Sequence, residues 1–186
     1  MSGEIYWYKH IPKGLSKLFP KMLSSKSNKE LVLEKIQGIS LSYLYSMGCL
    51  TLEHLKMVML DLEQIHTKPI PKGEYNIYAN WADKLTTRIE EYIYNCDDLS
   101  DDNLYWEVRD KLEDYAKQDL GIRSIIHGDP VLSNILLDSS DNLKFIDMRG
   151  KLKDNLTIDG DKFYDYAKVH QSLLGYDYIL HDKEFD

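Results

Sequence analysis

The sequence predicts an α+β fold in which a mainly helical region surrounds a short β-hairpin. Apolar runs at 135–137 and 143–146 flank a cluster of turn-forming residues at 138–142, the pattern of a hairpin. Apolar side chains also recur at helical spacing over three longer segments, 52–66, 77–94 and 104–120. Together, these patterns favour a helical body with little sheet.

The segments before the first long helix are short. Residues 4–10 are expected to form the end of a helix closed by Pro12, and 15–19 a single helical turn. Residues 22–25 and 30–36 alternate enough to predict two paired strands, the second ending at Gln37-Gly38.

Helix starts are marked by hydroxyl side chains. Ser40 can cap a short helix, and Thr51 can form a capping box with His54 in place of the usual Glu. The stripe from Leu52 to Ile65 is interpreted as core, and His66, at the end of this helix, as structural rather than chemical.

Three polar side chains around the hairpin give the strongest functional signal. Asn134 follows Asp129 by five residues, and Asp147 follows the second apolar run. Phosphoryl transfer from a nucleotide needs such a set, because one carboxylate accepts the proton of the attacking hydroxyl while an amide and a second carboxylate hold magnesium. Pairing centred near Ser140 and Asp141 predicts Asn134 roughly opposite Asp147. Each residue alone fits a surface turn equally well; their combined spacing favours chemistry.

The motif His-Gly-Asp-x4-Asn-Ile-Leu, the following Ile-Asp, and Gly-Asp-Lys-Phe-Tyr-Asp-Tyr-Ala at 160–167 resemble the aminoglycoside phosphotransferase and choline kinase superfamily. The last motif departs from the family pattern, with Lys162 for Pro and Tyr166 for Leu. The resemblance covers about 4–180, and segment 4–12 is similar to small-molecule kinases of bacterial surface-polysaccharide pathways.

The resemblance implies a protein-kinase-like fold with a truncated small lobe over residues 1–36 and a mainly helical large lobe over 37–186 that carries the catalytic hairpin. It further implies ATP and Mg²⁺ as cofactors. In this family pattern Asp129 is the catalytic base, and Asn134 and Asp147 are the metal ligands.

The same resemblance assigns supporting roles to four other residues. Glu34 and Ile36 would lie at the hinge between the lobes, beside the adenine of the nucleotide. His127 and Asp165 would hold the catalytic loop by hydrogen bonds, and His127 would not act as a base.

The sequence lacks two family elements, the Gly-x-Gly-x-x-Gly phosphate loop and the Val-Ala-x-Lys strand. Glu4 occupies the position of the family's helix glutamate, with no lysine partner before it. The chain is therefore interpreted as a shortened kinase, a relic without efficient catalysis, or a kinase completed by another chain. Weak ATP binding, slow turnover and a homodimer through the exposed small-lobe edge are expected.

The favoured function is an ATP-dependent phosphotransferase acting on a hydroxyl of a small metabolite, such as a sugar, an amino alcohol or an aminoglycoside. The alternative is a catalytically impaired kinase-like binding module. The 14 Tyr and 3 Trp residues could supply an aromatic cage for a quaternary ammonium, but most lie on apolar helix faces, which favours core packing.

Composition excludes several other classes. The net charge of −8 argues against a nucleic-acid partner. It would favour a cationic acceptor if the negative charge were concentrated near the site. The simpler interpretation of the charge is that an acidic surface keeps the protein soluble. No apolar run approaches the roughly 20 residues of a membrane span, and no signal-peptide pattern opens the sequence. Cys49 and Cys96 lie in dissimilar contexts and fit a reducing cytoplasm.

Overall fold

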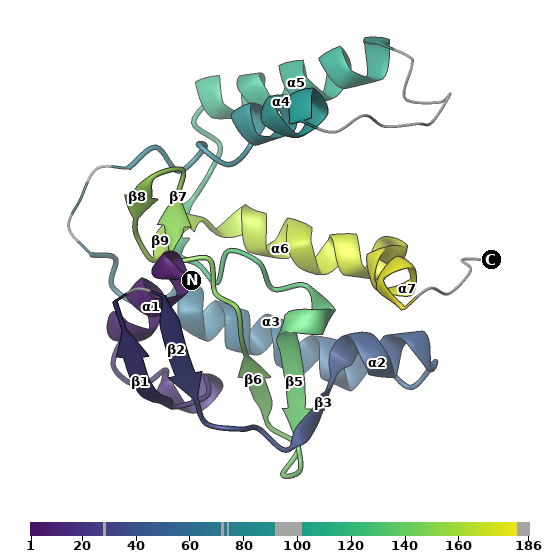
Figure 1. Ribbon diagram of the computed structural model, residues 1–186. Helices are drawn as coiled ribbons and strands as arrows, with labels where there is room; N and C mark the ends of the chain where they lie inside the picture. Colours follow the sequence, from purple (N-terminus) through teal and green to yellow (C-terminus); the bar gives the residue numbers. More distant parts are fainter. Residues whose placement is uncertain (28, 72, 74, 92–101, 182–186) are drawn as a thin grey trace.

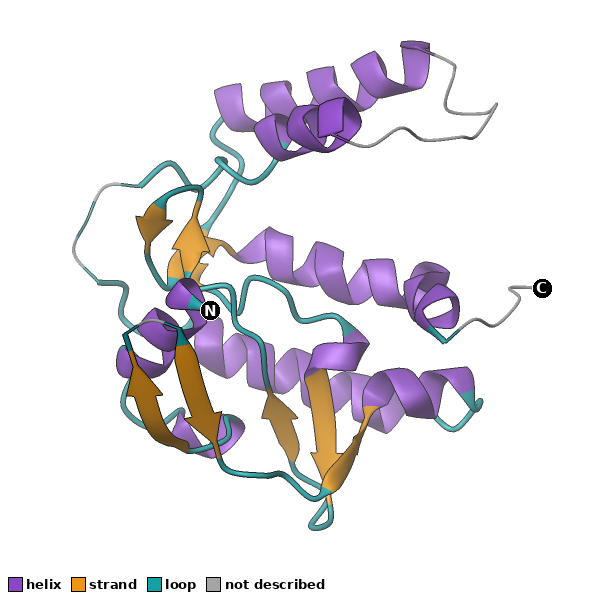
Figure 2. Ribbon diagram, in the orientation of Figure 1, coloured by secondary structure: helices purple, strands orange, loops and turns teal. Residues whose placement is uncertain are grey.

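The computed structural model describes residues 1–27, 29–71, 73, 75–91 and 102–181 (Figure 1). Helices account for most of the regular secondary structure among the described residues, and the strands form small separate groups (Figure 2). The α-helices are α1 (Ser2–Lys9), α2 (Leu41–Ser46), α3 (Leu52–His66), α4 (Ala82–Glu91), α5 (Asp102–Lys117), α6 (Lys162–Gln171) and α7 (Asp177–Leu180). Shorter helical turns are η1 (Ser16–Leu18), η3 (Leu132–Asn134) and η4 (Ser172–Tyr176). No helix among the described residues is long and apolar enough to cross a membrane.

The strands pair antiparallel throughout. They are β1 (Met22–Lys26), β2 (Glu30–Leu33), β3 (Gly38–Ser40), β4 (Arg123–Ile125), β5 (Ile135–Asp138), β6 (Leu143–Phe145), β7 (Lys151–Leu152), β8 (Asn155–Leu156) and β9 (Asp159–Asp161). The sheets are β1–β2, β3–β5–β6, β4–β9 and β7–β8. The prediction of an α+β fold is thus confirmed.

The second predicted strand is shorter than expected. β2 ends at Leu33, which pairs with Met22, rather than continuing to Ile36. Pro20 lies just before the start of β1 and has no N–H to extend the ladder. Only one further bond forms there, from Glu34 N to Lys21 O at 2.9 Å.

Strand β3 is not predicted by the sequence patterns. Gly38 does not terminate the preceding strand; it starts a new one that pairs with Asp138 and places segment 38–40 on the sheet of the β5–β6 hairpin. A Cβ at Gly38 would lie 2.3 Å from Leu137 O, so glycine is needed here for close backbone approach.

The predicted hairpin of β5 and β6 is present, but its register is shifted by one residue. Ile146 N donates to Asn134 O at 3.0 Å, so Asn134 lies opposite Ile146 and not Asp147. The cause is a three-residue loop that ends with Asp141 in the left-handed region, at φ 57°. The Asp138 carboxylate accepts from Ser140 N at 2.8 Å and fixes this turn.

Both predicted helix caps are confirmed. The Ser40 hydroxyl accepts from Tyr43 N, and Thr51 and His54 form the capping box. The apolar stripe of α3 is only partly core, because Leu52 is 68% and Met59 42% exposed. These two residues lie beside a surface cavity of about 420 Å³ on this helix, and burial begins at Val58.

The other two predicted helices have different bounds. α4 begins at Ala82 instead of residue 77, because Asn76 Oδ1 accepts from Tyr78 N at 3.0 Å and forms a turn. The predicted extension over 92–94 lies outside the described residues. α5 ends at Lys117, before Asp119 at φ 50°, and α4 and α5 pack against each other (Figure 1).

The main core lies between α1, the segment after η1, α3 and the hairpin. The Trp7 and Phe19 rings lie 4.5 Å apart, and Phe145 of β6 packs on Phe19 at 6.3 Å. Trp7 Nε1 donates to Ile126 O at 2.9 Å, which links α1 to the segment before the His-Gly-Asp motif.

A second contact fixes α1 through its backbone. A Cβ at Gly150 would lie 1.8 Å from Gly3 O, and a Cβ at Gly3 would lie 2.1 Å from Arg149 O. Gly150 also has φ 59°, so no other residue satisfies both demands.

We predict that Gly150→Ala lowers the free energy of unfolding by more than Gly48→Ala does. Gly48 has a similar φ of 67° but no atom near its Cβ position, so it isolates the backbone cost of about 1–2 kcal/mol. Urea unfolding of both variants measures the difference. Equal losses would mean that the Gly3–Gly150 contact relaxes without cost.

Candidate active site

The segment that carries the His-Gly-Asp motif is an irregular loop between β4 and η3. Gly128 adopts φ 87°, and a Cβ there would lie 2.7 Å from the Cβ of Arg149. Pro130 follows directly and disfavours a helix at Asp129, so the loop runs extended until η3 begins at Leu132. Leu132 N then donates to Ser172 Oγ at 2.9 Å, which secures the far end of the loop to η4.

A buried carboxylate holds the near end of this loop. Asp165 of α6 is 0% exposed; its Oδ1 accepts from Gly128 N at 2.7 Å and its Oδ2 from His127 N at 2.9 Å. His66 Nε2 at the end of α3 lies 2.9 Å from the same Oδ2. This contact gives His66 the structural role predicted for it, but the sequence does not indicate Asp165 as its partner, because the two are 99 residues apart.

His127 is completely buried and is part of the loop framework. Its Nδ1 accepts from Asp129 N at 3.2 Å, and its carbonyl accepts from Arg149 N at 3.0 Å. Burial lowers the pKa of His127, although the nearby carboxylates of Asp165 and Asp129 act in the opposite direction. A neutral imidazole that accepts a backbone N–H keeps Asp129 in place.

Asp129 is partly exposed and lies where the loop meets α6. Asn134 Nδ2 donates to its backbone carbonyl at 2.9 Å, so the candidate base and a candidate metal ligand are tied together. Lys168 Nζ lies 3.0 Å from Asp129 Oδ1. Lys168 was missed by the sequence analysis, although it stands one helical turn after Asp165 and therefore on the same face of α6.

Asn134 and Asp147 come to the same end of the hairpin. Asp147 follows the residue paired with Asn134, adopts φ 57° and is exposed. No group of three or more His, Cys, Asp or Glu side chains is placed to hold a metal ion in the parts of the chain described above.

Glu4 of α1 lies close to Asp147. Burial, and then the Asp147 carboxylate, raise the pKa of Glu4. The neighbouring Tyr8 has a buried hydroxyl without a hydrogen-bond partner among the described residues. Its pKa is raised by burial and by the carboxylates of Glu4, Glu34 and Asp147. The carboxylates of Glu4, Glu34 and Asp147 thus lie close enough to the Tyr8 hydroxyl to affect its pKa.

The two candidate hinge residues lie in the segment between β2 and β3. Glu34 is exposed and Ile36 is partly buried. Glu34 is close enough to Tyr8 to affect its pKa, so this end of the segment approaches α1. Their contact with a nucleotide stays a prediction.

Solved structures of small-molecule kinases match this chain. An ethanolamine kinase of Plasmodium vivax matches at 15% identity and a TM-score of 0.60, over 95% of this chain and 51% of its own. The choline kinase LicA of Streptococcus pneumoniae matches at 21% identity and a TM-score of 0.62, over 100% of this chain and 63% of its own. The chain has the fold of these small-molecule kinases.

This kinase fold also occurs in an aminoglycoside phosphotransferase from Streptomyces rimosus, solved with ADP and streptomycin. It matches at 14% identity and a TM-score of 0.57, over 100% of this chain and 75% of its own. LicA has been solved with AMP. The chain spans only about half to two thirds of the ethanolamine and choline kinases. No protein-family model matches the sequence, and no curated protein sequence is significantly similar to it.

We predict that Asp165→Asn destabilises the protein by about 1–3 kcal/mol, because an amide places an N–H against the buried donors that the carboxylate now satisfies. Asp110→Asn, an exposed position on α5, is the matched control and should cost nothing measurable. Chemical unfolding of both variants is the measurement, and equal stabilities would contradict the assignment of Asp165.

We also predict that Glu4→Gln stabilises the metal-free protein at pH 7. The folded-state pKa of Glu4 is raised, so its ionisation opposes folding above the ordinary value of 4.5, and the neutral amide removes that cost. The gain should vanish as the pH falls below that value, where Glu4 is protonated in both states. Thermal unfolding across this pH range is the measurement; a gain that persists at low pH would have another cause.

Proposed function

We propose that the chain belongs to an ATP-dependent kinase that phosphorylates a hydroxyl of a small metabolite. The observation that carries the proposal is the hydrogen bond from Asn134 Nδ2 to Asp129 O. It joins the two parts that phosphoryl transfer requires, a carboxylate for the acceptor hydroxyl and an amide for the metal. The kinase fold, and the AMP and ADP in two of the matching structures, support the same reaction class.

In this proposal Asp129 receives the proton of the acceptor hydroxyl. The hydroxyl oxygen attacks the γ-phosphorus, the bond between that phosphorus and the β–γ bridging oxygen breaks, and ADP departs. His127 and Asn134 fix the backbone on either side of Asp129, and Lys168 orients its carboxylate.

Asn134 and Asp147 are the residues that would hold Mg²⁺. The Asn134 amide uses its N–H to bond to Asp129 O, which leaves its oxygen for a cation, and Asp147 adds an exposed carboxylate. When bound, the ion neutralises charge on the β- and γ-phosphates.

We predict that Asp129→Asn lowers the rate of phosphoryl transfer by a factor of about 10²–10⁴ and leaves the affinity for Mg–ATP unchanged, because the lost carboxylate acts on the acceptor. Asp147→Asn is the companion variant, and it should weaken Mg²⁺-dependent ATP binding. Labelled ATP and equilibrium binding provide the two readouts.

Unchanged turnover in Asp129→Asn would remove this residue from the mechanism. A wild-type protein that binds Mg–ATP but transfers phosphate to no hydroxyl compound would instead favour the alternative, a kinase-like binding module.

A further inference from the structure

The acceptor of a phosphoryl group must bring its hydroxyl to Asp129, so a cavity whose wall contacts that carboxylate and is large enough for a small metabolite is a candidate acceptor site. A cavity of about 280 Å³ lies between α4 and α6. Lys168 lines it and also lies 3.0 Å from Asp129 Oδ1, so the cavity wall reaches the candidate base. The described residues around the cavity are Asn80, Trp81, Lys84, Leu85, Arg88, Tyr164, Ala167, Lys168 and Gln171.

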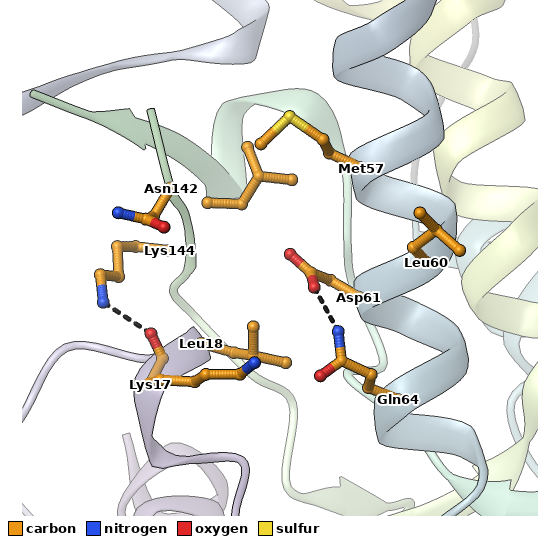
Figure 3. Close-up of a pocket in the computed structure, with 9 residues that line it drawn as sticks. Lys17, Leu18, Met57, Leu60, Asp61, Gln64, Asn142 and Lys144 are labelled. Atoms are coloured by element: carbon orange, nitrogen blue, oxygen red, sulfur yellow. Dashed lines mark hydrogen bonds between the residues drawn. The ribbon is translucent and has the colours of Figure 1, made fainter. Parts of the chain in front are cut away.

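A larger cavity of about 420 Å³ lies elsewhere, between η1, α3 and the tip of the hairpin (Figure 3). Asp61 accepts from Gln64 Nε2 at 2.6 Å, and Lys144 Nζ donates to Lys17 O at 2.6 Å. None of the candidate catalytic or metal-binding residues lines it. Its position rules it out as the place where the acceptor meets Asp129.

Positive charge dominates the cavity between α4 and α6, which we call the α4–α6 cavity. Lys84 Nζ and Arg149 Nη2 both donate to the hydroxyl of Tyr164, each at 2.8 Å. Tyr164 is 8% exposed, so both cations are held at a largely buried oxygen. The pKa of Lys84 is lowered by burial and by the charges of Arg149 and Lys168, which places these three cations within mutual influence. The lining residues given above include no Asp or Glu.

Three hydrogen-bond donors in this region have no acceptor. Asn80 Nδ2, Trp81 Nε1 and Arg149 Nη1 are buried and lack a partner among the described residues. Asn80 and Trp81 line the cavity, and Arg149 reaches it through Tyr164. Buried donors that lack acceptors are costly, and oxygen atoms of a ligand would satisfy them.

An aromatic cage for a cationic acceptor is not available here. Trp81 and Tyr164 do lie together, with ring centroids 5.2 Å apart. However, the Tyr164 ring already carries Arg149 at 4.6 Å and Lys84 at 5.5 Å from its centroid. A third cation would meet like charges, which disfavours an amino alcohol or an aminoglycoside.

We propose that the α4–α6 cavity binds a hydroxylated anion, a small compound that carries a phosphate or carboxylate group as well as the hydroxyl that is phosphorylated. This inference rests on the proposed function for the identity of the reaction, but the charge of the ligand follows from the cavity itself. Because Lys168 both lines the cavity and contacts Asp129, one small ligand can place its anionic group among the cations and its hydroxyl toward Asp129. The net charge of −8 for the whole chain conceals this local excess of cations.

Binding measured without nucleotide tests the proposal independently of turnover. Titration calorimetry compares four ligands: glucose 6-phosphate, gluconate and glucose, which share a six-carbon polyhydroxyl framework, and choline, which supplies the cationic comparison. Glucose 6-phosphate, gluconate or both should bind at least tenfold more tightly than glucose and choline, and the comparison of the first two identifies phosphate or carboxylate as the preferred group. Inorganic phosphate is the fifth ligand and should bind more weakly than the hydroxylated anion.

Lys84→Met keeps a flexible, unbranched side chain that is one atom shorter and removes the charge. It should weaken binding of the preferred anion about tenfold, whereas Lys13→Met, at an exposed lysine before η1, should bind like wild type. Far-UV circular dichroism of both variants verifies that they remain folded.

Several outcomes would overturn the inference. These are choline or glucose binding as tightly as the anions, inorganic phosphate binding as tightly as the hydroxylated anions, and unchanged anion affinity in Lys84→Met. Transfer assays with Mg–ATP separate this inference from the proposed function. Anion binding without transfer to any ligand would support the assignment of the cavity and contradict the proposed kinase activity. Transfer to glucose or choline alone would support the kinase activity and contradict the assignment of the cavity.

Discussion

The candidate site depends on one fully buried carboxylate. A buried anion is costly unless hydrogen bonds replace its hydration, and Asp165 receives them from two successive backbone N–H groups and from His66. These bonds join α3, α6 and the loop that carries Asp129. Because Lys168 lies one turn further along α6, the helix that braces the loop also supplies the ammonium group at the candidate base. Loss of this single charge would therefore disturb the loop framework, the base and the wall of the cavity together.

The sequence correctly predicted features that depend on residues close together in the chain. The caps at Ser40 and Thr51 and the existence of the hairpin depend on neighbouring residues, and these predictions are confirmed. The register was wrong by one residue, because it depends on whether Asp141 adopts a left-handed conformation, and composition alone leaves that choice open.

Features that depend on distant contacts were missed. Strand β3 forms because Gly38 allows its backbone to approach Leu137, 99 positions later in the chain. The residues around Gly38 do not indicate this pairing partner. The same holds for the contact between Lys168 and Asp129, and for the three cations near Tyr164 that come from separate segments. The net charge of a sequence does not show where the charged side chains group in the folded chain. A protein with a net negative charge can therefore have a basic cavity next to its candidate base.

The contact between Gly3 and Gly150 restricts the movement of α1. In protein kinases, activity is switched partly by moving the helix that bears the conserved glutamate toward or away from the nucleotide. Helix α1, which the sequence resemblance aligns with that helix through Glu4, touches the segment after Asp147 backbone to backbone, and Trp7 adds a hydrogen bond from its other end. A swing of α1 would break both contacts and expose the Trp7 indole. Helix α1 is therefore anchored at two points, by a backbone contact near its start and by a side-chain hydrogen bond near its end.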